Sequence, residues 1–178
     1  MPVRSFLKFR RFRFTALAGA VLPALLLLSV RPAGAAEPGW MSWDEGLRRA
    51  AETRRPVLVD VTTEWCGWCK RMDRDVYARP EVRDYLAQHF VRVKLDAESA
   101  SSATYGGKPY TGRTLAMRFG VSGYPTTIFL RPGGEHLVNV PGYVPAEQFL
   151  MLLRYVGEGH MDRGETFEAF QKSAGAGR

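Results

Sequence analysis

The sequence is poor in the residues that hold disulfide-rich and metal-binding proteins together. It contains two cysteines and three histidines in 178 residues, so one disulfide is the most that the chain can form within itself. His89, His136 and His160 show no spacing that suggests a metal cluster with the cysteines. We therefore expect no metal site and no required cofactor. A zinc site and a purely structural bridge remain the alternatives to a redox role for the cysteine pair.

Acidic residues are absent from residues 1–35, which hold six of the 25 Lys and Arg residues. The rest of the chain is close to neutral, so the formal net charge of +7 gives no reason to expect a nucleic-acid partner. The basic start precedes an apolar run from Ala16 to Val30 and then Ala33-Gly34-Ala35. This order is typical of a secretory signal peptide that is cleaved near Ala35.

Low-complexity segments and internal repeats are also absent, and we divide the chain into three parts. Residues 1–35 are the expected signal peptide, 36–160 a single domain, and 161–178 an extension with a short helix and a frayed tail. A periplasmic or otherwise exported protein without stable membrane insertion follows from this division. A retained membrane anchor is the alternative, but the apolar run is short and is interrupted by Gly19 and Pro23.

Beyond residue 36, the hydrophobic pattern alternates between strand and helix periodicity. Ser42 and Glu45 form a candidate capping box for a helix that ends at Arg54-Arg55-Pro56. Residues 98–112 lose periodicity and are expected to form a loop with a turn at Gly106-Gly107. Further strands are expected at 57–62, 91–95, 126–130 and 136–140, and further helices at 67–77, 81–88, 111–119, 145–156 and 166–170.

This order predicts an α/β fold with a central mixed sheet flanked by helices. A βαβ unit needs parallel strands, and the hairpin near the C-terminal end adds antiparallel ones. The turn after residues 57–62 then lies at the carboxyl end of a central strand, where sites are common in such sheets.

Both cysteines lie at this turn, in Trp65-Cys66-Gly67-Trp68-Cys69. Residues three apart on a helix share one face, so Cys66 and Cys69 are close enough for a disulfide. The start of a helix favours an anion, and therefore the reactive thiolate form of Cys66. We expect Cys66 to be the nucleophile and Cys69 the resolving thiol of a redox pair.

Asp60 interrupts the apolar run Val57–Val61, where an ionised carboxylate is costly to bury. It precedes Cys66 by six residues and is expected beneath the turn, where a carboxylate with a raised pKa could accept a proton from Cys69. The alternative is a side chain that reaches solvent at the sheet edge. Lys94, on the neighbouring strand, is a weaker candidate as its electrostatic partner.

The segment Tyr124-Pro125-Thr126 comes directly before a strand. Its proline is either an ordinary strand start or a cis bond that exposes the backbone of Tyr124 for pairing with a substrate peptide. Trp65 and Trp68, on either side of Gly67, are suited to binding protein surfaces. Core packing is the alternative for both tryptophans, and more so for Trp65.

The chain resembles the thioredoxin superfamily over roughly residues 42–157, in Val59-Asp60, the segments Glu64–Lys70 and Phe119–Thr126, and Gly142. The Cys-Gly-Trp-Cys sequence after a leader is similar to exported bacterial thioredoxin-like proteins. The resemblance implies a cis Pro125 opposite the cysteines, Cys66 as the attacking thiol, and Asp60 and Lys94 as proton-transfer helpers.

Gly67-Trp68 lacks the histidine found in the more oxidising members of the superfamily, which favours a reductase. We therefore expect an exported thiol–disulfide oxidoreductase that reduces protein disulfides and receives electrons from a membrane partner. A non-catalytic binding module on the same fold is the alternative. The loop at residues 98–112 is longer than in compact thioredoxins, and we expect it to border the active site and select partners.

Overall fold

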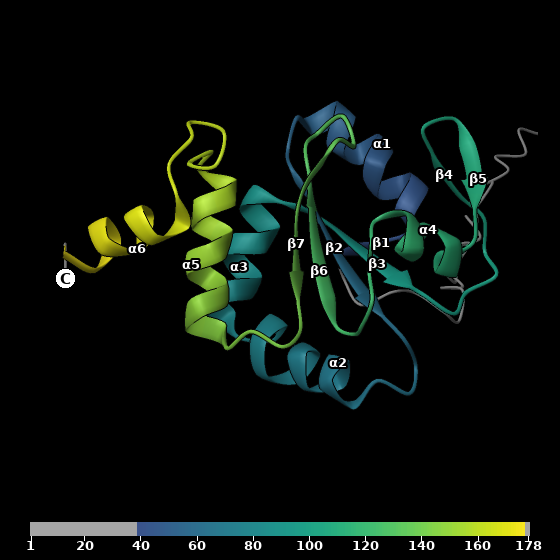
Figure 1. Ribbon diagram of the computed structural model, residues 1–178, viewed down its shortest axis with the longest axis horizontal. Helices are drawn as coiled ribbons and strands as arrows, with labels where there is room; N and C mark the ends of the chain where they lie inside the picture. The colour runs from purple at the N-terminus through teal and green to yellow at the C-terminus, as the bar shows by residue number, and fades with distance from the viewer. Residues whose placement is uncertain (1–38, 177–178) are drawn as a thin grey trace, which may run out of the picture. The chain divides into compact units, whose positions relative to one another are not determined.

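A five-stranded mixed sheet forms the centre of the computed structural model, which describes residues 39–176 (Figure 1). The strand order is β1-β3-β2-β6-β7; β3 pairs in parallel with β1 and β2, and β6 pairs antiparallel with β2 and β7. The strands are β1 (Trp40–Met41), β2 (Val57–Thr62), β3 (Val91–Asp96), β6 (Thr126–Leu130) and β7 (His136–Pro141). The α/β fold expected from the sequence is confirmed. The predicted signal peptide lies outside the described residues.

Helices cover both faces of this sheet (Figure 1). One hydrophobic core joins α1 and α4 to the sheet, and a second joins α2, α3 and α5 to its other face. The helices are α1 (Trp43–Thr53), α2 (Gly67–Met72), α3 (Pro80–His89), α4 (Gly112–Arg118), α5 (Ala146–Gly157) and α6 (Phe167–Ala176). No helix within residues 39–176 is both long and apolar enough to cross a membrane.

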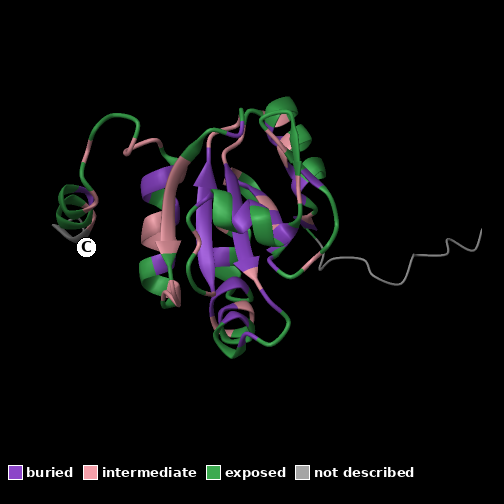
Figure 2. Ribbon diagram, turned by 45° about the vertical axis from the view of Figure 1, so that its right-hand side comes forward, coloured by how far each residue is buried: buried purple, intermediate pink, exposed green. Residues whose placement is uncertain are grey.

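Strand β2 lies between the two cores, and Figure 2 shows it and β6 almost wholly buried, while the edge strand β7 is half-buried. Successive side chains of a strand point to opposite faces. Val57, Val59 and Val61 therefore enter the core under α1 and α4, whereas Leu58 enters the core under α3 and α5. Asp60 shares the face of Leu58, and this places a carboxylate on the side of the sheet that α2 covers.

The expected capping box at Ser42 is wrong. Ser42 is the N-cap of α1, but its side chain makes no capping hydrogen bond. A capping box forms instead at α4, where the Thr111 hydroxyl accepts a bond from the Thr114 N–H at 3.2 Å and the Thr114 hydroxyl accepts one from the Thr111 N–H at 2.9 Å. The hydroxyl of threonine can serve at both positions of this reciprocal arrangement.

The expected loop at residues 98–112 is a small β-hairpin, β4 (Ala103–Tyr105) paired with β5 (Lys108–Tyr110). Its turn is Gly106-Gly107, as predicted, and both glycines have positive φ angles. The Trp43 indole donates to the Thr104 carbonyl at 2.9 Å, and the Thr104 N–H donates to an Asp44 carboxylate oxygen at 2.8 Å. The hairpin is thus fastened to α1. Figure 1 shows it well away from α2, so the hairpin itself does not border the start of that helix.

Two helices differ in length from the prediction. The expected helix at residues 67–77 consists of α2 followed by a π-helical turn, Asp73–Tyr77. The expected helix at residues 166–170 extends to Ala176 as α6, and its Phe170 is buried against α5. The short strand β1 was not predicted, because two residues are too few to show a period.

Candidate active site

Cys66 and Cys69 form a disulfide at the start of α2, with their Cα atoms 5.3 Å apart. Cys66 is the N-cap of the helix, and its sulfur accepts a hydrogen bond from the Cys69 N–H at 3.0 Å. An added Cβ at Gly67 would meet no atom within 4 Å, so this residue leaves open space beside Cys66. Both cysteines are nearly buried, 4% and 3% exposed, so position rather than exposure distinguishes them.

Asp60 is 1% exposed, on the strand that leads into this turn. The alternative of a carboxylate at the solvent edge is therefore wrong. Burial raises the pKa of Asp60 to about 6, although nearby Lys94 lowers it in part. The Oδ1 atom of Asp60 and the hydroxyl of Thr63 are buried without a hydrogen-bond partner among the described residues.

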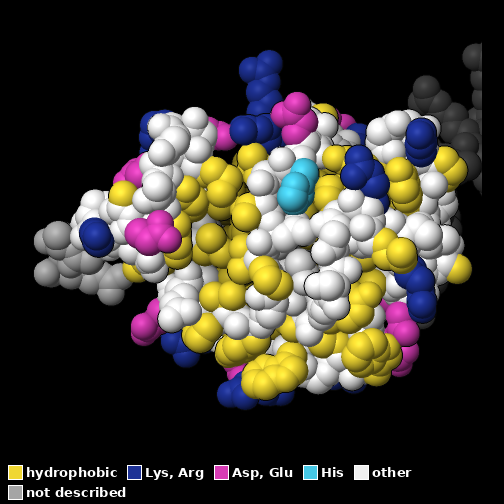
Figure 3. Space-filling model, viewed as in Figure 1, with side chains coloured by type: hydrophobic (Ala, Val, Ile, Leu, Met, Phe, Trp, Pro, Cys, Tyr) yellow, Lys and Arg dark blue, Asp and Glu magenta, His cyan; other side chains and the backbone are white. Residues whose placement is uncertain are grey.

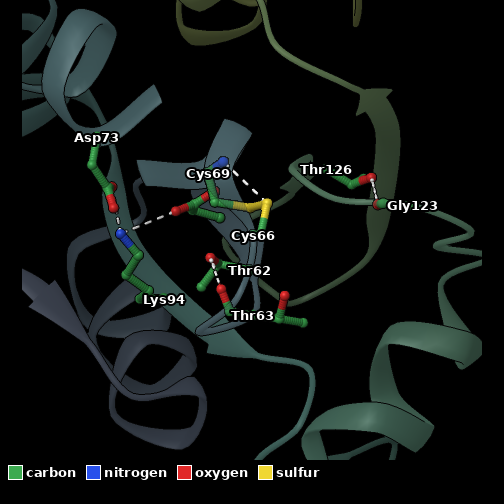
Figure 4. The surroundings of a disulfide bond; sticks show 9 residues. Thr62, Thr63, Cys66, Cys69, Asp73, Lys94, Gly123 and Thr126 are labelled. Atoms are coloured by element: carbon green, nitrogen blue, oxygen red, sulfur yellow. Dashed lines mark hydrogen bonds and ion pairs between the residues drawn. A yellow bond between two sulfur atoms is a disulfide. The ribbon is translucent and has the colours of Figure 1, made fainter. Parts of the chain in front are cut away.

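Lys94 is the direct neighbour of Asp60 across the parallel pairing of β2 and β3. Its ammonium lies 3.2 Å from Asp60 Oδ2 and 2.5 Å from Asp73 Oδ1, and so bridges two carboxylates. Burial lowers the pKa of Lys94, but the two carboxylates outweigh this effect and the net pKa is raised. Figure 4 shows Lys94 and Asp73 on one side of the disulfide, with Thr126 and Gly123 on the other.

Asp73 and Tyr77 belong to the same cluster but were missed by the sequence reasoning. Asp73 follows Cys69 by four residues, at the start of the π-helical turn that continues α2, and this spacing was the available signal. The Tyr77 hydroxyl lies 3.4 Å from that of Thr127, the residue of β6 that pairs with Asp60. Burial, with Asp60 close by, raises the pKa of Tyr77 well above its ordinary value, so the phenol stays protonated.

In the segment Tyr124-Pro125-Thr126, Thr126 lies on the side of the disulfide opposite Lys94 (Figure 4), and the Tyr124–Pro125 peptide bond that precedes it is cis. Pro125 and Thr126 are buried, and the Thr126 hydroxyl donates to the Gly123 carbonyl at 2.8 Å. Tyr124 is half-buried, and its ring lies 6.0 Å from that of Trp65. Tyr124 is therefore the side chain of this segment that is open to a partner.

Trp65 and Trp68 are exposed large hydrophobic residues, at 67% and 54% exposure. Core packing, the alternative considered for both and more so for Trp65 than for Trp68, is therefore wrong. The ring centres of Trp68 and Tyr143 are 5.6 Å apart, and the Arg71 guanidinium lies 5.1 Å from the Trp68 ring centre. Figure 3 shows hydrophobic side chains along the lower edge of the molecule, the region of α2.

No group of three or more His, Cys, Asp or Glu side chains in the described part of the chain is arranged to hold a metal ion. The chemistry that the cluster itself offers is thiol–disulfide exchange, with a buried carboxylate and its ammonium partner on the neighbouring strands β2 and β3.

Comparison with known proteins relates this arrangement to disulfide-exchange proteins. The thiol:disulfide interchange protein DsbD of Ralstonia nicotianae is 35% identical over 113 residues, which are 62% of this chain and 17% of that protein. The disulfide bond reductase DsbH of Chlamydia pneumoniae is 24% identical over 120 residues, 67% of this chain and 71% of that protein. The chain therefore spans about one sixth of the length of DsbD.

A solution structure of a thioredoxin from Thermus thermophilus superimposes with a TM-score of 0.53 and 30% identity, over 68% of this chain and 93% of that one. The family model described as a thioredoxin-like domain matches residues 43–157, which include the cysteines, Asp60, Lys94 and the cis-proline segment. Because this match covers more than half of the sequence, the chain belongs to the thioredoxin-like domain family.

Proposed function

We propose that the protein is an exported thiol–disulfide oxidoreductase that reduces protein disulfides. The observation that carries this proposal is the Cys66–Cys69 disulfide at the start of α2, on the same face of the sheet as buried Asp60. A bridge that closes so short a loop removes little chain entropy, so this pair is suited to opening and closing rather than to holding the fold together. The relationship to DsbD and DsbH supports the same class of reaction.

The reaction begins with the reduced pair. The Cys66 thiolate attacks one sulfur of a substrate disulfide, which forms a mixed disulfide and releases one substrate thiolate. Cys69 loses its proton and attacks the Cys66 sulfur, so the mixed disulfide breaks and the second substrate thiolate leaves. Two electrons have then passed to the substrate, and the Cys66–Cys69 disulfide is formed. A donor thiol pair restores the reduced state by the reverse exchange.

In this mechanism Asp60 accepts the proton of Cys69, directly or through a water molecule. Its pKa of about 6 suits such a role, because the carboxylate is ionised at neutral pH and still holds a proton far more readily than an ordinary aspartate. Lys94 bridges Asp60 and Asp73, and we assign it to positioning the carboxylate and limiting its charge.

The proposed docking surface for substrates surrounds the disulfide. The rings of Trp65 and Trp68 are exposed and that of Tyr124 is half-buried, so all three can make apolar contacts with a protein chain. Gly67 leaves open space beside Cys66 for that chain. Pro125 and Thr126 are buried, so in this proposal they position the backbone next to Tyr124 rather than contact the substrate with their side chains. The substrates in this proposal are protein disulfides, held by contacts that suit many sequences.

The reductive direction rests on two observations. Gly67-Trp68 has no histidine between the cysteines, and the related DsbH is named a disulfide bond reductase. Export rests on the basic and apolar leader at residues 1–35. Electrons for a reductase outside the cytoplasm must cross the membrane, so we infer a membrane-bound electron donor.

The deciding experiment uses Cys66→Ser, Cys69→Ser and the double variant. We expect Cys66→Ser to abolish insulin reduction, and Cys69→Ser to accumulate mixed disulfides with protein substrates that dithiothreitol releases. The double variant is the control for non-covalent capture. Reduction at the wild-type rate by Cys66→Ser would end the proposal.

A second candidate function is a non-catalytic binding module, which the exposed Trp65 and Trp68 would favour. The two readings give different outcomes in the same experiment. A binding module captures partners equally well with the double cysteine variant, whereas the enzyme gives reducible covalent adducts with Cys69→Ser alone.

A further inference from the structure

A cavity of about 570 Å³ opens beside α2, and the proposed redox chemistry does not use most of its lining. Its walls come from segments far apart in the sequence: the β1–β3 edge of the sheet, α2 with its π-helical turn, and α3. Five of the lining residues are basic and one is acidic. The lining residues are Trp40, Lys70, Asp73, Arg74, Tyr77, Ala78, Arg83, Arg92 and Lys94.

The sheet register explains why basic groups face this cavity. Arg92 and Lys94 alternate with the buried Val91, Val93 and Leu95 along β3, so they point to the face that α2 and α3 cover. Arg92 pairs with Trp40 of β1, and both basic groups lie over the Trp40 ring, at 5.9 and 5.2 Å from its centre. Trp40 and Tyr77 contact each other edge to face at 5.0 Å and supply an apolar wall.

The charges in the cavity do not cancel. Lys94 contacts both Asp73 and the buried Asp60, so these three groups carry a net charge of −1 when both carboxylates are ionised, and the four other basic lining residues exceed this charge. Arg74 and Arg83 each pair with an aspartate next to them in sequence, Asp75 and Asp84, but these pairs are exposed and such pairs are weak.

Lys70 has no acidic partner among the described residues. It also lies four positions before Arg74 on the same helical face, a like-charge spacing that is unfavourable in an isolated helix. An anion in the cavity would relieve this repulsion.

We propose that this cavity binds a small polyanion, a molecule that carries two or more phosphate or carboxylate groups. Lys70, Arg74 and Arg83 supply the charge, from α2, its π-helical turn and α3. A guanidinium group can donate two parallel hydrogen bonds to the oxygen atoms of one phosphate or carboxylate group. The volume lies within the range of about 300 to 1,000 Å³ that is usual for small-molecule sites.

The test measures binding of pyrophosphate and of citrate to the oxidised, wild-type protein by calorimetry, at an ionic strength held constant with sodium chloride. We expect saturable binding of at least one of the two. Binding should weaken at least tenfold in the Arg74→Gln/Arg83→Gln double variant.

The matched control is Arg48→Gln/Arg49→Gln, which removes the same charge from α1, whose residues do not line the cavity. We expect this control to bind like the wild type. Equal weakening in both double variants would overturn the proposal, because it would reduce the effect to net charge.

The absence of saturable binding of either anion would also overturn it. The oxidised protein needs no redox partner for this measurement. The result is therefore independent of the oxidoreductase activity proposed above.

Discussion

Asp60 places a carboxylate on the central strand β2, where the residue is 1% exposed. Its Oδ2 atom contacts Lys94, and its Oδ1 atom has no hydrogen-bond partner among the residues that the structure describes. A group held in this way is a poor contributor to stability when charged, because an ion loses more hydration than one partner restores. A buried group with a shifted pKa is common where a residue takes part in chemistry.

The Asp60→Asn variant tests whether the buried carboxylate destabilises the protein when it is charged, through the pH dependence of unfolding. Because the native state raises the pKa of Asp60 from 3.8 to about 6, its contribution to stability is present below about pH 4 and is lost as the pH rises through about 6. Relative to the wild type, Asp60→Asn should therefore gain about 2 kcal/mol between pH 4 and pH 7. Urea unfolding of the oxidised proteins measures this difference.

Asp84→Asn, at an exposed position of α3, is the control and should show no such gain. Parallel stability profiles for Asp60→Asn and the wild type would contradict the assigned pKa.

The two partners of the shared ammonium permit a sharper test. Lys94 lowers the pKa of Asp60, whereas Asp73 raises it. Lys94→Met should therefore raise the pKa of Asp60. Asp73→Asn should lower it, because Lys94 then forms an ion pair with Asp60 alone. The titration of the Asp60 carboxyl carbon, followed by nuclear magnetic resonance in the oxidised protein, reports both shifts. Shifts in the same direction would show that the bridge does not control Asp60.

At the scale of single elements, the hairpin β4–β5 shows how a polar segment gains structure from a distant helix. Its contacts with Trp43 and Asp44 join residues about 60 positions apart. Asp44→Ala should remove the bond to the Thr104 N–H and destabilise the hairpin by about 1 kcal/mol.

Glu45→Ala is the matched control, because Glu45 is also acidic and also lies in the first turn of α1. Hydrogen exchange at the Thr104 amide should speed up in Asp44→Ala and stay unchanged in Glu45→Ala. Equal effects would mean that the charge at the helix start, rather than the hydrogen bond, matters.

Local sequence patterns predicted most of the elements, because each periodic segment shows its own buried face. The strand at residues 126–130 and the helix that begins after Pro145 follow such patterns closely. The features that were missed depend on partners far along the chain. Asp73 gains its role from Lys94, 21 positions later, and β1 exists because Trp40 and Met41 meet Arg92 and Val93. The spacing of Asp73 from Cys69 could place it on the same helical face, but no local period shows that it meets Lys94 or that Trp40 and Met41 form a strand.

The candidate site was predictable to a similar extent. The cysteine spacing and an aspartate within an apolar run pointed to Cys66, Cys69 and Asp60 before any coordinates. Whether Trp65 faces solvent could not be read in the same way, since an exposed tryptophan and a core tryptophan look alike in sequence. Its exposure follows from the turn between β2 and α2, which carries it away from both cores.

At the scale of the described domain, the two cores enclose β2, the strand that leads into the cysteine turn. Strand β2 is buried on both faces, and the turn at residues 63–66 joins its end to α2, so the disulfide follows directly on an enclosed strand. Because of this placement, the redox state of the cysteine pair affects the stability of the whole domain. If the folded domain holds the disulfide more tightly than the unfolded chain does, the oxidised form must be the more stable one.

The proposed reductive direction therefore predicts that the oxidised protein unfolds at a higher urea concentration than the reduced protein. A reductant has a stable disulfide, and for this two-electron couple each 30 mV in reduction potential corresponds to about 1.4 kcal/mol. Urea unfolding with and without dithiothreitol measures the difference, and the Cys66→Ser/Cys69→Ser variant should show none. The opposite order, with the reduced form more stable, is the behaviour of a strong oxidant and would reverse the direction of electron flow while leaving Cys66 and Cys69 as the exchanging pair.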